Sequence, residues 1–223
     1  MPNHTQVIVE VIGSSDALDQ LADLASEGKS ILKHFIPLPD NAIETRTFTT
    51  KDGETGTYSA FAETRNGGEV DGYDLACKLW GTKWADYEVD LIGDSRDSGS
   101  PSIKIKCNSA WSPPIEGYLT LTKLLPIAVV MTYQDEGYGY IGATAIAGGQ
   151  VVADHEYDTV GMDAYNKGRG LGEPPEDQGG DEFLEWMDQM HVLTFELLDL
   201  CEETVVDRLE DALNTAFDSV TEQ

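Results

Sequence analysis

Residues 78–93 read KLWGTKWADYEVDLIG, and this stretch decides how the fold is interpreted. Trp80 and Trp84 bracket Gly81, and glycine is the residue that most often follows the end of a helix. Alternating apolar residues come next, at 88–92, with the period of a strand that has one buried face. The stretch therefore predicts a junction between a helix at 71–80 and a strand, with two large aromatic side chains at the turn.

Further strands and helices flank this junction without the regular spacing of βαβ units. Strands are expected where β-branched and aromatic residues cluster, at residues 6–12, 31–37, 57–64, 103–107, 128–133, 138–147 and 150–155. Helices are expected at residues 16–26, and from the proline pair at 113–114 to about residue 124. This order predicts an α+β sandwich with a largely antiparallel sheet.

The composition changes after residue 158. Residues 1–158 are expected to form one α+β domain, and residues 159–180, which are rich in glycine and proline, a linker. Residues 181–223 carry apolar side chains at helical spacing with acidic residues between them, which predicts an acidic helical region. Because the apolar stripe drifts around a straight helix, a break or bend is expected near residues 199–203.

The chain of 223 residues has a net charge of -27 and an isoelectric point near 4.1. Such a charge repels nucleic acid and anionic membranes, so neither is predicted as a direct partner. No apolar run approaches the ~20 residues that a membrane span needs, and the N-terminus lacks the apolar segment of a signal peptide. Cys77, Cys107 and Cys201 form no CxxC pair, which argues against a zinc ribbon or a disulfide framework. These features predict a cytoplasmic protein.

Five short motifs follow one another within residues 1–147. They are Asn3, FIPLP at 35–39, WGTKW at 80–84, AWSPP at 110–114 and the segment 133–142. In these motifs the chain resembles the YubB-type ferredoxin-like domain family of phage and plasmid proteins. The resemblance implies a ferredoxin-like α+β fold, a mobile-element origin and a location in the host cytoplasm. It implies no established reaction and no catalytic residue, and the linker and acidic region look like additions to that domain.

Trp80, Lys83, Trp84 and Trp111 form the first candidate site. One interpretation is an aromatic pocket with Lys83 at its mouth, because tryptophan and basic side chains are favoured at recognition sites. The other is a structural corner in which each indole is buried and its N–H binds a carbonyl. The second interpretation is favoured because large aromatic side chains are usually part of the core.

Asp154, Glu156 and Asp158 are weak candidates for a metal site. On a strand they share one face while His155 lies on the other, and three carboxylates on one face can hold a divalent cation. A solvated strand edge is the commoner arrangement, so neither a metal nor a cofactor is predicted. GYGYIG at 137–142 matches a dinucleotide-binding fingerprint, but a strand-like segment follows where a helix is needed, which favours a tight hairpin.

The second candidate site is the acidic face of the C-terminal region. Residues 181–222 contain 13 acidic residues and one basic residue, Arg208. The carboxylates expected on the exposed side of the helix belong to Glu196, Asp199, Glu203, Asp207, Glu210 and Asp211. A charged row of this kind approaches the spacing of phosphates along DNA. We therefore expect a phage-type accessory protein that binds a basic host protein, as a DNA mimic or an inhibitor of a host or defence nucleic-acid-binding protein.

Two alternatives stay open. The acidic helical region can be a solvated cover for the sheet, or the contact of a homodimer. The chain can also be a small-ligand or nucleic-acid-processing enzyme that uses the Trp/Lys pocket, although no convergent acid–base set or hydrolase motif occurs, so an enzyme is not predicted. A concave pocket at the tryptophans would favour the enzyme, and carboxylates in rows on a convex face would favour the binding protein.

Overall fold

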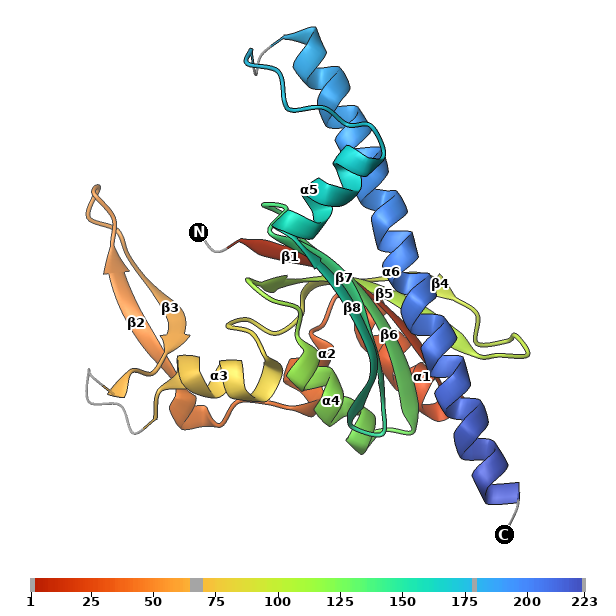
Figure 1. The fold of residues 1–223 in the computed structure, drawn as a ribbon. Helices are drawn as coiled ribbons and strands as arrows, with labels where there is room; N and C mark the ends of the chain where they lie inside the picture. The colour runs from red at the N-terminus through yellow and green to blue at the C-terminus, as the bar shows by residue number, and fades with distance from the viewer. Residues whose placement is uncertain (1–2, 65–69, 178–179, 222–223) are drawn as a thin grey trace.

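A six-stranded antiparallel sheet forms the centre of the molecule (Figure 1). The computed structural model describes the backbone of residues 3–64, 70–177 and 180–221, and the side chains of these residues up to 210. The strand order is β4 (Tyr87–Asp94), β5 (Ser102–Ala110), β1 (His4–Gly13), β6 (Ile127–Asp135), β7 (Tyr140–Ala147) and β8 (Gln150–Asp158), and every neighbouring pair is antiparallel. The expected α+β class with a largely antiparallel sheet is therefore confirmed.

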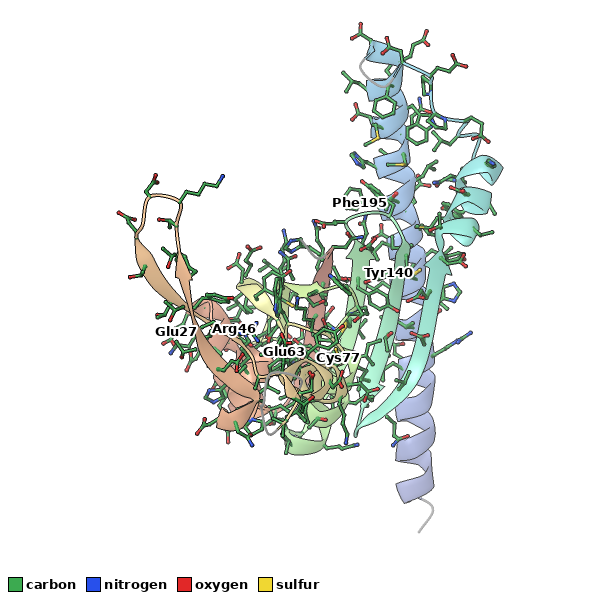
Figure 2. The ribbon with its side chains drawn as sticks, turned by 90° about the vertical axis from the view of Figure 1, so that its left-hand side faces the viewer. Glu27, Arg46, Glu63, Cys77, Tyr140 and Phe195 are labelled. Atoms are coloured by element: carbon green, nitrogen blue, oxygen red, sulfur yellow. The ribbon has the colours of Figure 1, made fainter. Side chains whose placement is uncertain are left out.

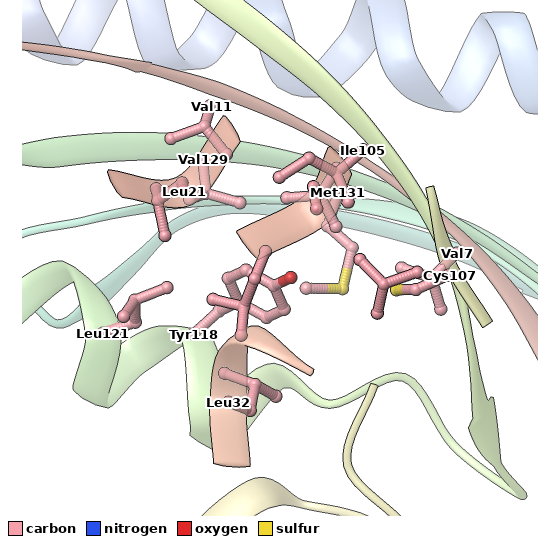
Figure 3. Close-up of a cluster of buried hydrophobic side chains, with 14 of the residues drawn as sticks. Val7, Val11, Leu21, Leu32, Ile105, Cys107, Tyr118, Leu121, Val129 and Met131 are labelled. Carbon is pink, nitrogen blue, oxygen red and sulfur yellow. The ribbon is translucent and has the colours of Figure 1, made fainter. Parts of the chain in front are cut away.

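The main core lies on one face of this sheet, under α1 (Ser15–Ser26), α2 (Ile31–Phe35) and α4 (Ile115–Leu124). Val7, Val9 and Val11 alternate along β1 and point into this core, as the period of a half-buried strand requires. Figure 3 shows Leu21 and Leu121 from the helices close to the strand residues of this cluster. Burying each such side chain contributes roughly 1.5–3 kcal/mol. We call this side of the sheet the inner face.

The segment expected as a strand at 31–37 is instead the short helix α2. Its first turn is held by Asp86, whose carboxylate accepts the backbone N–H groups of Ile31 at 2.7 Å and Leu32 at 3.1 Å. The hydroxyl oxygen of Ser30 caps the same turn by accepting the N–H of Lys33. These bonds satisfy the amide groups that a helix start leaves open, and they outweigh the local β preference of the segment.

A separate two-stranded ribbon of β2 (Ile43–Thr49) and β3 (Thr55–Phe61) projects from the body of the protein beside α3 (Gly72–Trp80) (Figure 1). The 3-10 turn η1 (Asp40–Ala42) leads into it. The sequence predicted only a weak strand at 57–64, and β2 was not expected. Asp71 caps the N-terminus of α3 and Gly81, at φ 79°, ends it, so the predicted helix at 71–80 is confirmed.

The last two helices lie on the opposite, outer face. The expected linker at 159–180 begins with a helix, α5 (Thr159–Gly168), and α6 (Asp181–Thr221) is one continuous helix of 41 residues, ~62 Å long. The expected break near residues 199–203 is therefore wrong. Among the described residues, no helix combines the length and apolarity that crossing a membrane requires.

The helix stays straight because its apolar stripe changes partners along its length. The C-terminal half of α6 packs on β6, β7 and β8, where small side chains allow close approach. The buried residues of this contact are Val130, Ala143, Ala145 and Ala153 from the strands and Cys201, Val205 and Leu209 from α6. The N-terminal half of α6 extends beyond the sheet beside α5 (Figure 1). In this half Trp186 donates its indole N–H to the Gly172 carbonyl at 2.8 Å. The drifting stripe thus meets a different surface in each half.

Candidate functional site

Trp80 is a core side chain. Only 3% of its surface is exposed, and its indole N–H donates to the carbonyl of Ile36 at 2.9 Å. The structural interpretation is therefore right for this tryptophan. It is wrong for Trp84 and Trp111, which are 36% and 54% exposed.

Lys83 lies between these two exposed indoles. Its ammonium nitrogen is 5.0 Å from the ring centroid of Trp84 and 6.0 Å from that of Trp111. Both distances are within the range at which a cation is attracted by the face of an indole. We call Lys83, Trp84 and Trp111 the indole–lysine site.

The fold holds Trp111 in a conformation that bulky residues rarely adopt. Its φ is 75°, a left-handed value that costs on the order of 1–3 kcal/mol. The backbone N–H of Trp111 donates to the Asn3 carbonyl at 3.0 Å, and its carbonyl accepts the Tyr140 hydroxyl at 3.0 Å. Burial raises the pKa of Tyr140 to about 12, so this hydroxyl keeps its proton at neutral pH. Bonds on both sides of the residue thus fix an exposed indole in place.

A cleft of about 720 Å³ opens beside the indole–lysine site, between the β2–β3 ribbon and α3. Its lining includes Tyr58, Ser59, Ala60 and Phe61 of β3, Arg46 of β2, Asp71, Tyr73 and Asp74 at the start of α3, and Lys83 and Trp84. Figure 2 places Arg46 and Glu63 together at the base of the ribbon. The guanidinium of Arg46 donates to Glu44 at 2.6 Å and to Glu63 at 3.1 Å, so its charge is balanced within the ribbon.

Each weak metal candidate has a structural role of its own. Asp154 accepts the Thr144 hydroxyl at 2.6 Å, Glu156 accepts the Tyr133 hydroxyl at 3.2 Å, and Asp158 caps α5 by accepting the Gly161 N–H at 2.8 Å. The three side chains alternate along β8 with residues of the outer face, as the strand period requires. Within the part of the chain that the structure describes, no three His, Cys, Asp or Glu side chains are arranged to hold a metal ion.

The glycine-rich motif at 137–142 spans the turn after β6 and the first residues of β7. The amides of Gly137 and Gly139 donate to one carboxylate oxygen of Asp135, at 3.1 and 3.0 Å. A carboxylate of the chain itself therefore occupies the amides that a phosphate would need. The hairpin interpretation of this motif is confirmed.

The acidic face of α6 divides into paired and unpaired carboxylates. Glu196 binds Arg169 at 2.6 Å. Asp199, Glu203, Asp207 and Glu210 are exposed and have no ion-pair partner among the described residues. We call these four the acidic row. The side chain of Asp211 lies outside the described residues.

Sequence reasoning did not find the residues of the ribbon that line the cleft, notably Arg46, Tyr58 and Phe61. Tyr58 and Phe61 lie within the strand expected at 57–64, but β2 and β3 have no buried face, so no pattern marked these residues as the lining of a cleft. The sequence signal for a paired ribbon was the presence of one aromatic residue, Phe48 or Tyr58, in each of the two segments. In the structure both side chains are exposed, and their ring centroids lie 6.3 Å apart.

Comparison with known proteins adds little to this description. No family model matches the chain, and no curated protein matches it. A crystal structure of a protein api92 from Yersinia pseudotuberculosis, described under the family model DUF1281, is similar over 71% of this chain and 99% of that one, with 10% identity and a TM-score of 0.48. A similarity of this size carries no argument about function.

Proposed function

We propose that the protein acts by binding a basic partner protein through the acidic row of α6, and not by catalysis. The observation that carries the proposal is the row itself: four exposed carboxylates on one continuous helix that have no ion-pair partner among the described residues. Like charges held side by side repel one another, and a lysine- or arginine-rich surface would relieve that repulsion. In this proposal the chain is a phage-type accessory protein of the host cytoplasm.

The anchoring of the helix supports a preorganised surface. Leu197, Cys201, Val205 and Leu209 are buried against the strands, and the row lies on the side of α6 that faces solvent. Asp199, Glu203 and Asp207 recur every four residues, about 6 Å apart along the axis. A DNA strand carries one charge per ~3.4 Å, so the row resembles a sparser phosphate line. A DNA-binding protein of the host or of a defence system is therefore the class of partner that we propose.

The order of elements supports a ferredoxin-like assignment of the sheet. The segments β1, α1, β4, β5, α4 and β6 follow the β-α-β-β-α-β pattern, and their strands stand in the order β4-β5-β1-β6. In that assignment the ribbon, the strands β7 and β8, and α6 are additions. The acidic row then belongs to an addition, as expected of a surface that gives one member of a fold its own partner.

The cleft against Lys83 and Trp84 is the concave pocket that the enzyme alternative requires, but the carboxylates that line it give that alternative less support than the acidic row gives to binding. Asp71 is engaged by the backbone amides of Tyr73 and Asp74, and Glu63 is engaged by Arg46. Both carboxylates therefore already serve the structure, one as a helix cap and one as an ion-pair partner, which gives little support to a general acid–base pair in the cleft.

A charge-matched pair of variants tests the proposal. In the row variant, Asp199→Asn, Glu203→Gln, Asp207→Asn and Glu210→Gln remove four charges. In the control, Asp23→Asn, Asp52→Asn, Glu54→Gln and Asp97→Asn remove four exposed charges elsewhere. The probe is a labelled peptide rich in lysine and arginine, titrated between about 50 and 200 mM salt.

The row variant should bind the probe at least about fourfold more weakly than the control, because exposed charge pairs contribute roughly 0.2–1 kcal/mol each. The probe should also be displaced by duplex DNA at low salt. Equal affinity of the two variants would show that only net charge matters, and the proposal would be wrong.

A further inference from the structure

β3 has an unpaired edge. It belongs to a sheet of two strands, so within the described residues only β2 pairs with it. The N–H of Ala62 donates to the Ala42 carbonyl at 2.9 Å and that of Thr50 to the Glu54 carbonyl at 2.8 Å. Hydrogen-bonded and non-bonded pairs alternate in an antiparallel ribbon. Even-numbered residues of β3 therefore bond β2, and the backbone groups of Thr57 and Ser59 and the N–H of Phe61 point away from it. The Phe61 carbonyl accepts the Arg46 guanidinium at 3.4 Å.

The cleft runs along this free edge. Successive side chains of a strand point to opposite faces, so a cavity over one face meets every second residue. The cleft instead meets four consecutive residues, 58–61, which places it at the edge. A second cavity of about 230 Å³ is also lined by Ser59, Ala60 and Phe61, and Trp84 borders both. The edge of β3 and the side chain of Trp84 thus border both cavities, and we call the two cavities with this shared border the slot.

Two lysines line the slot, Lys33 at the smaller cavity and Lys83 at the larger one, and the exposed indoles of Trp84 and Trp111 flank Lys83. Arg46 is bound by two glutamates, whereas Lys83 has no carboxylate partner among the described residues. The two indoles hold its ammonium group beside the slot and shield it from part of the solvent. A carboxylate that reached this position would gain a partly shielded ion pair.

We infer that this slot binds an extended peptide, which adds to the free edge of β3 as a third strand. The backbone groups of Ser59 and its neighbours pair with the peptide backbone, a carboxylate side chain of the peptide binds Lys83, and an apolar or aromatic one packs on Trp84. The inference is independent of the function proposed for α6. Asp71 and Asp74 line the same cleft, and together with the net charge of -27 they oppose a polyanion such as nucleic acid.

Proline substitutions on the two edges of the ribbon test the inference. Ser59→Pro removes an outward N–H from β3 without touching the pairing with β2. Thr45 stands directly opposite Ser59, so Thr45→Pro removes the matching N–H from the far edge of β2. Proline is tolerated at free edges, and thermal unfolding checks that both variants fold. The probe is a labelled, capped peptide of about six residues in which valine and threonine alternate around one tyrosine and one aspartate.

Fluorescence anisotropy should show saturable binding that Ser59→Pro weakens at least tenfold and Thr45→Pro leaves unchanged. Lys83→Met should weaken the aspartate peptide but not a version with asparagine in its place. Absence of saturable binding to the full chain, or equal binding by the two proline variants, would overturn the inference. The inference would also be wrong if an adenine mononucleotide bound the chain and the peptide did not. It would be wrong, too, if sedimentation detected a dimer that Ser59→Pro dissociates, since a second copy of the chain would then occupy the edge.

Discussion

The ammonium nitrogen of Lys83 lies 6.0 Å from the ring centroid of Trp111, although the two residues belong to loops on either side of two strands. Lys83 precedes β4 and Trp111 follows β5, and these strands pair antiparallel with Tyr87 opposite Asn108. The loops are also joined directly, because the Ser112 hydroxyl donates to the Gly81 carbonyl at 2.8 Å. The indole–lysine site is thus a product of strand pairing.

Replacing the tryptophans one at a time should separate core from surface. Trp80→Ala should lower the free energy of unfolding by ~3–5 kcal/mol, because it leaves a cavity and an unpaired Ile36 carbonyl. Trp111→Ala should change it by less than about 1 kcal/mol, because more than half of this side chain is exposed. Urea denaturation of both variants measures the difference. A large loss for Trp111→Ala would mean that its contact with Lys83 supports the fold.

Tyr118 carries a buried hydroxyl without a hydrogen-bond partner in the described structure. Tyr118→Phe should leave the free energy of unfolding unchanged or raise it by about 1 kcal/mol, since an unsatisfied polar group is removed from the core. Tyr133→Phe is the matched control, because its hydroxyl donates to Glu156 and its loss should destabilise by about 1 kcal/mol. Thermal and chemical unfolding should agree on the opposite signs. A destabilised Tyr118→Phe would point to a partner for the hydroxyl, such as a buried water.

The three cysteines should differ sharply in reactivity. Cys107 and Cys201 are buried, and burial raises the pKa of both thiols, that of Cys107 well above its ordinary value and that of Cys201 to about 11. Cys77 is partly exposed. A thiol reagent at neutral pH should therefore label one site rapidly, and Cys77→Ser should abolish that phase. Slow labelling of Cys201 then reports the opening of α6 from the sheet, and rapid labelling of Cys201 in the native protein would contradict the packing of α6.

Part of the pH dependence of the free energy of unfolding should come from the carboxyl group of Asp86. Burial raises the pKa of its carboxyl above the ordinary value, against the hydrogen bonds from Ser30, Ile31 and Leu32 that lower it. A carboxyl with a higher pKa in the folded chain binds its proton more tightly there. Its contribution to stability is therefore largest below the ordinary carboxyl pKa and is lost as pH rises through the raised value.

The measurement compares the wild type with Asp86→Asn, which does not titrate at this position. The free energy of unfolding of the wild type minus that of the variant should increase as pH is lowered from neutral toward the ordinary carboxyl range. Subtraction removes the contribution of the other carboxylates. A difference that decreases with falling pH would mean that the hydrogen bonds to the carboxylate dominate over burial.

Local patterns were enough to predict the six strands of the large sheet and the helices α1, α3 and α4. Val7, Val9 and Val11 alternate within β1, and the caps at Asp71 and Gly81 lie next to the helix that they bound. α2 was missed because its anchor, Asp86, is 55 residues away from Ile31 in the sequence. β2 was missed because the ribbon projects from the core and has no apolar face to reveal it.

The candidate sites were only partly predictable for the same reason. The acidic row follows from helical spacing alone, so its members could be named in advance. The exposure of Trp111, which follows β5, depends on its backbone hydrogen bonds to Asn3 and Tyr140. Asn3 precedes β1 and Tyr140 begins β7, so these partners are far apart in the sequence. The continuity of α6 depends on a change of partner, from the alanines of β7 to the region of Gly172. The spacing of apolar residues along the helix does not show which surfaces will cover them, so it could not predict that α6 is continuous.

The packing of α6 on the alanines of β7 and β8 also sets the order in which this protein can be completed during synthesis. Ala143, Ala145 and Ala153 leave the ribosome before Cys201, Val205 and Leu209, which cover them. At roughly 5–20 residues per second, several seconds separate the two events, and the half-built sheet exposes its outer face for that time. Methyl groups are the smallest apolar side chains that such a face can carry. Apart from Val130, the buried strand residues of this contact are alanines, so the sheet exposes little apolar area there until α6 covers it.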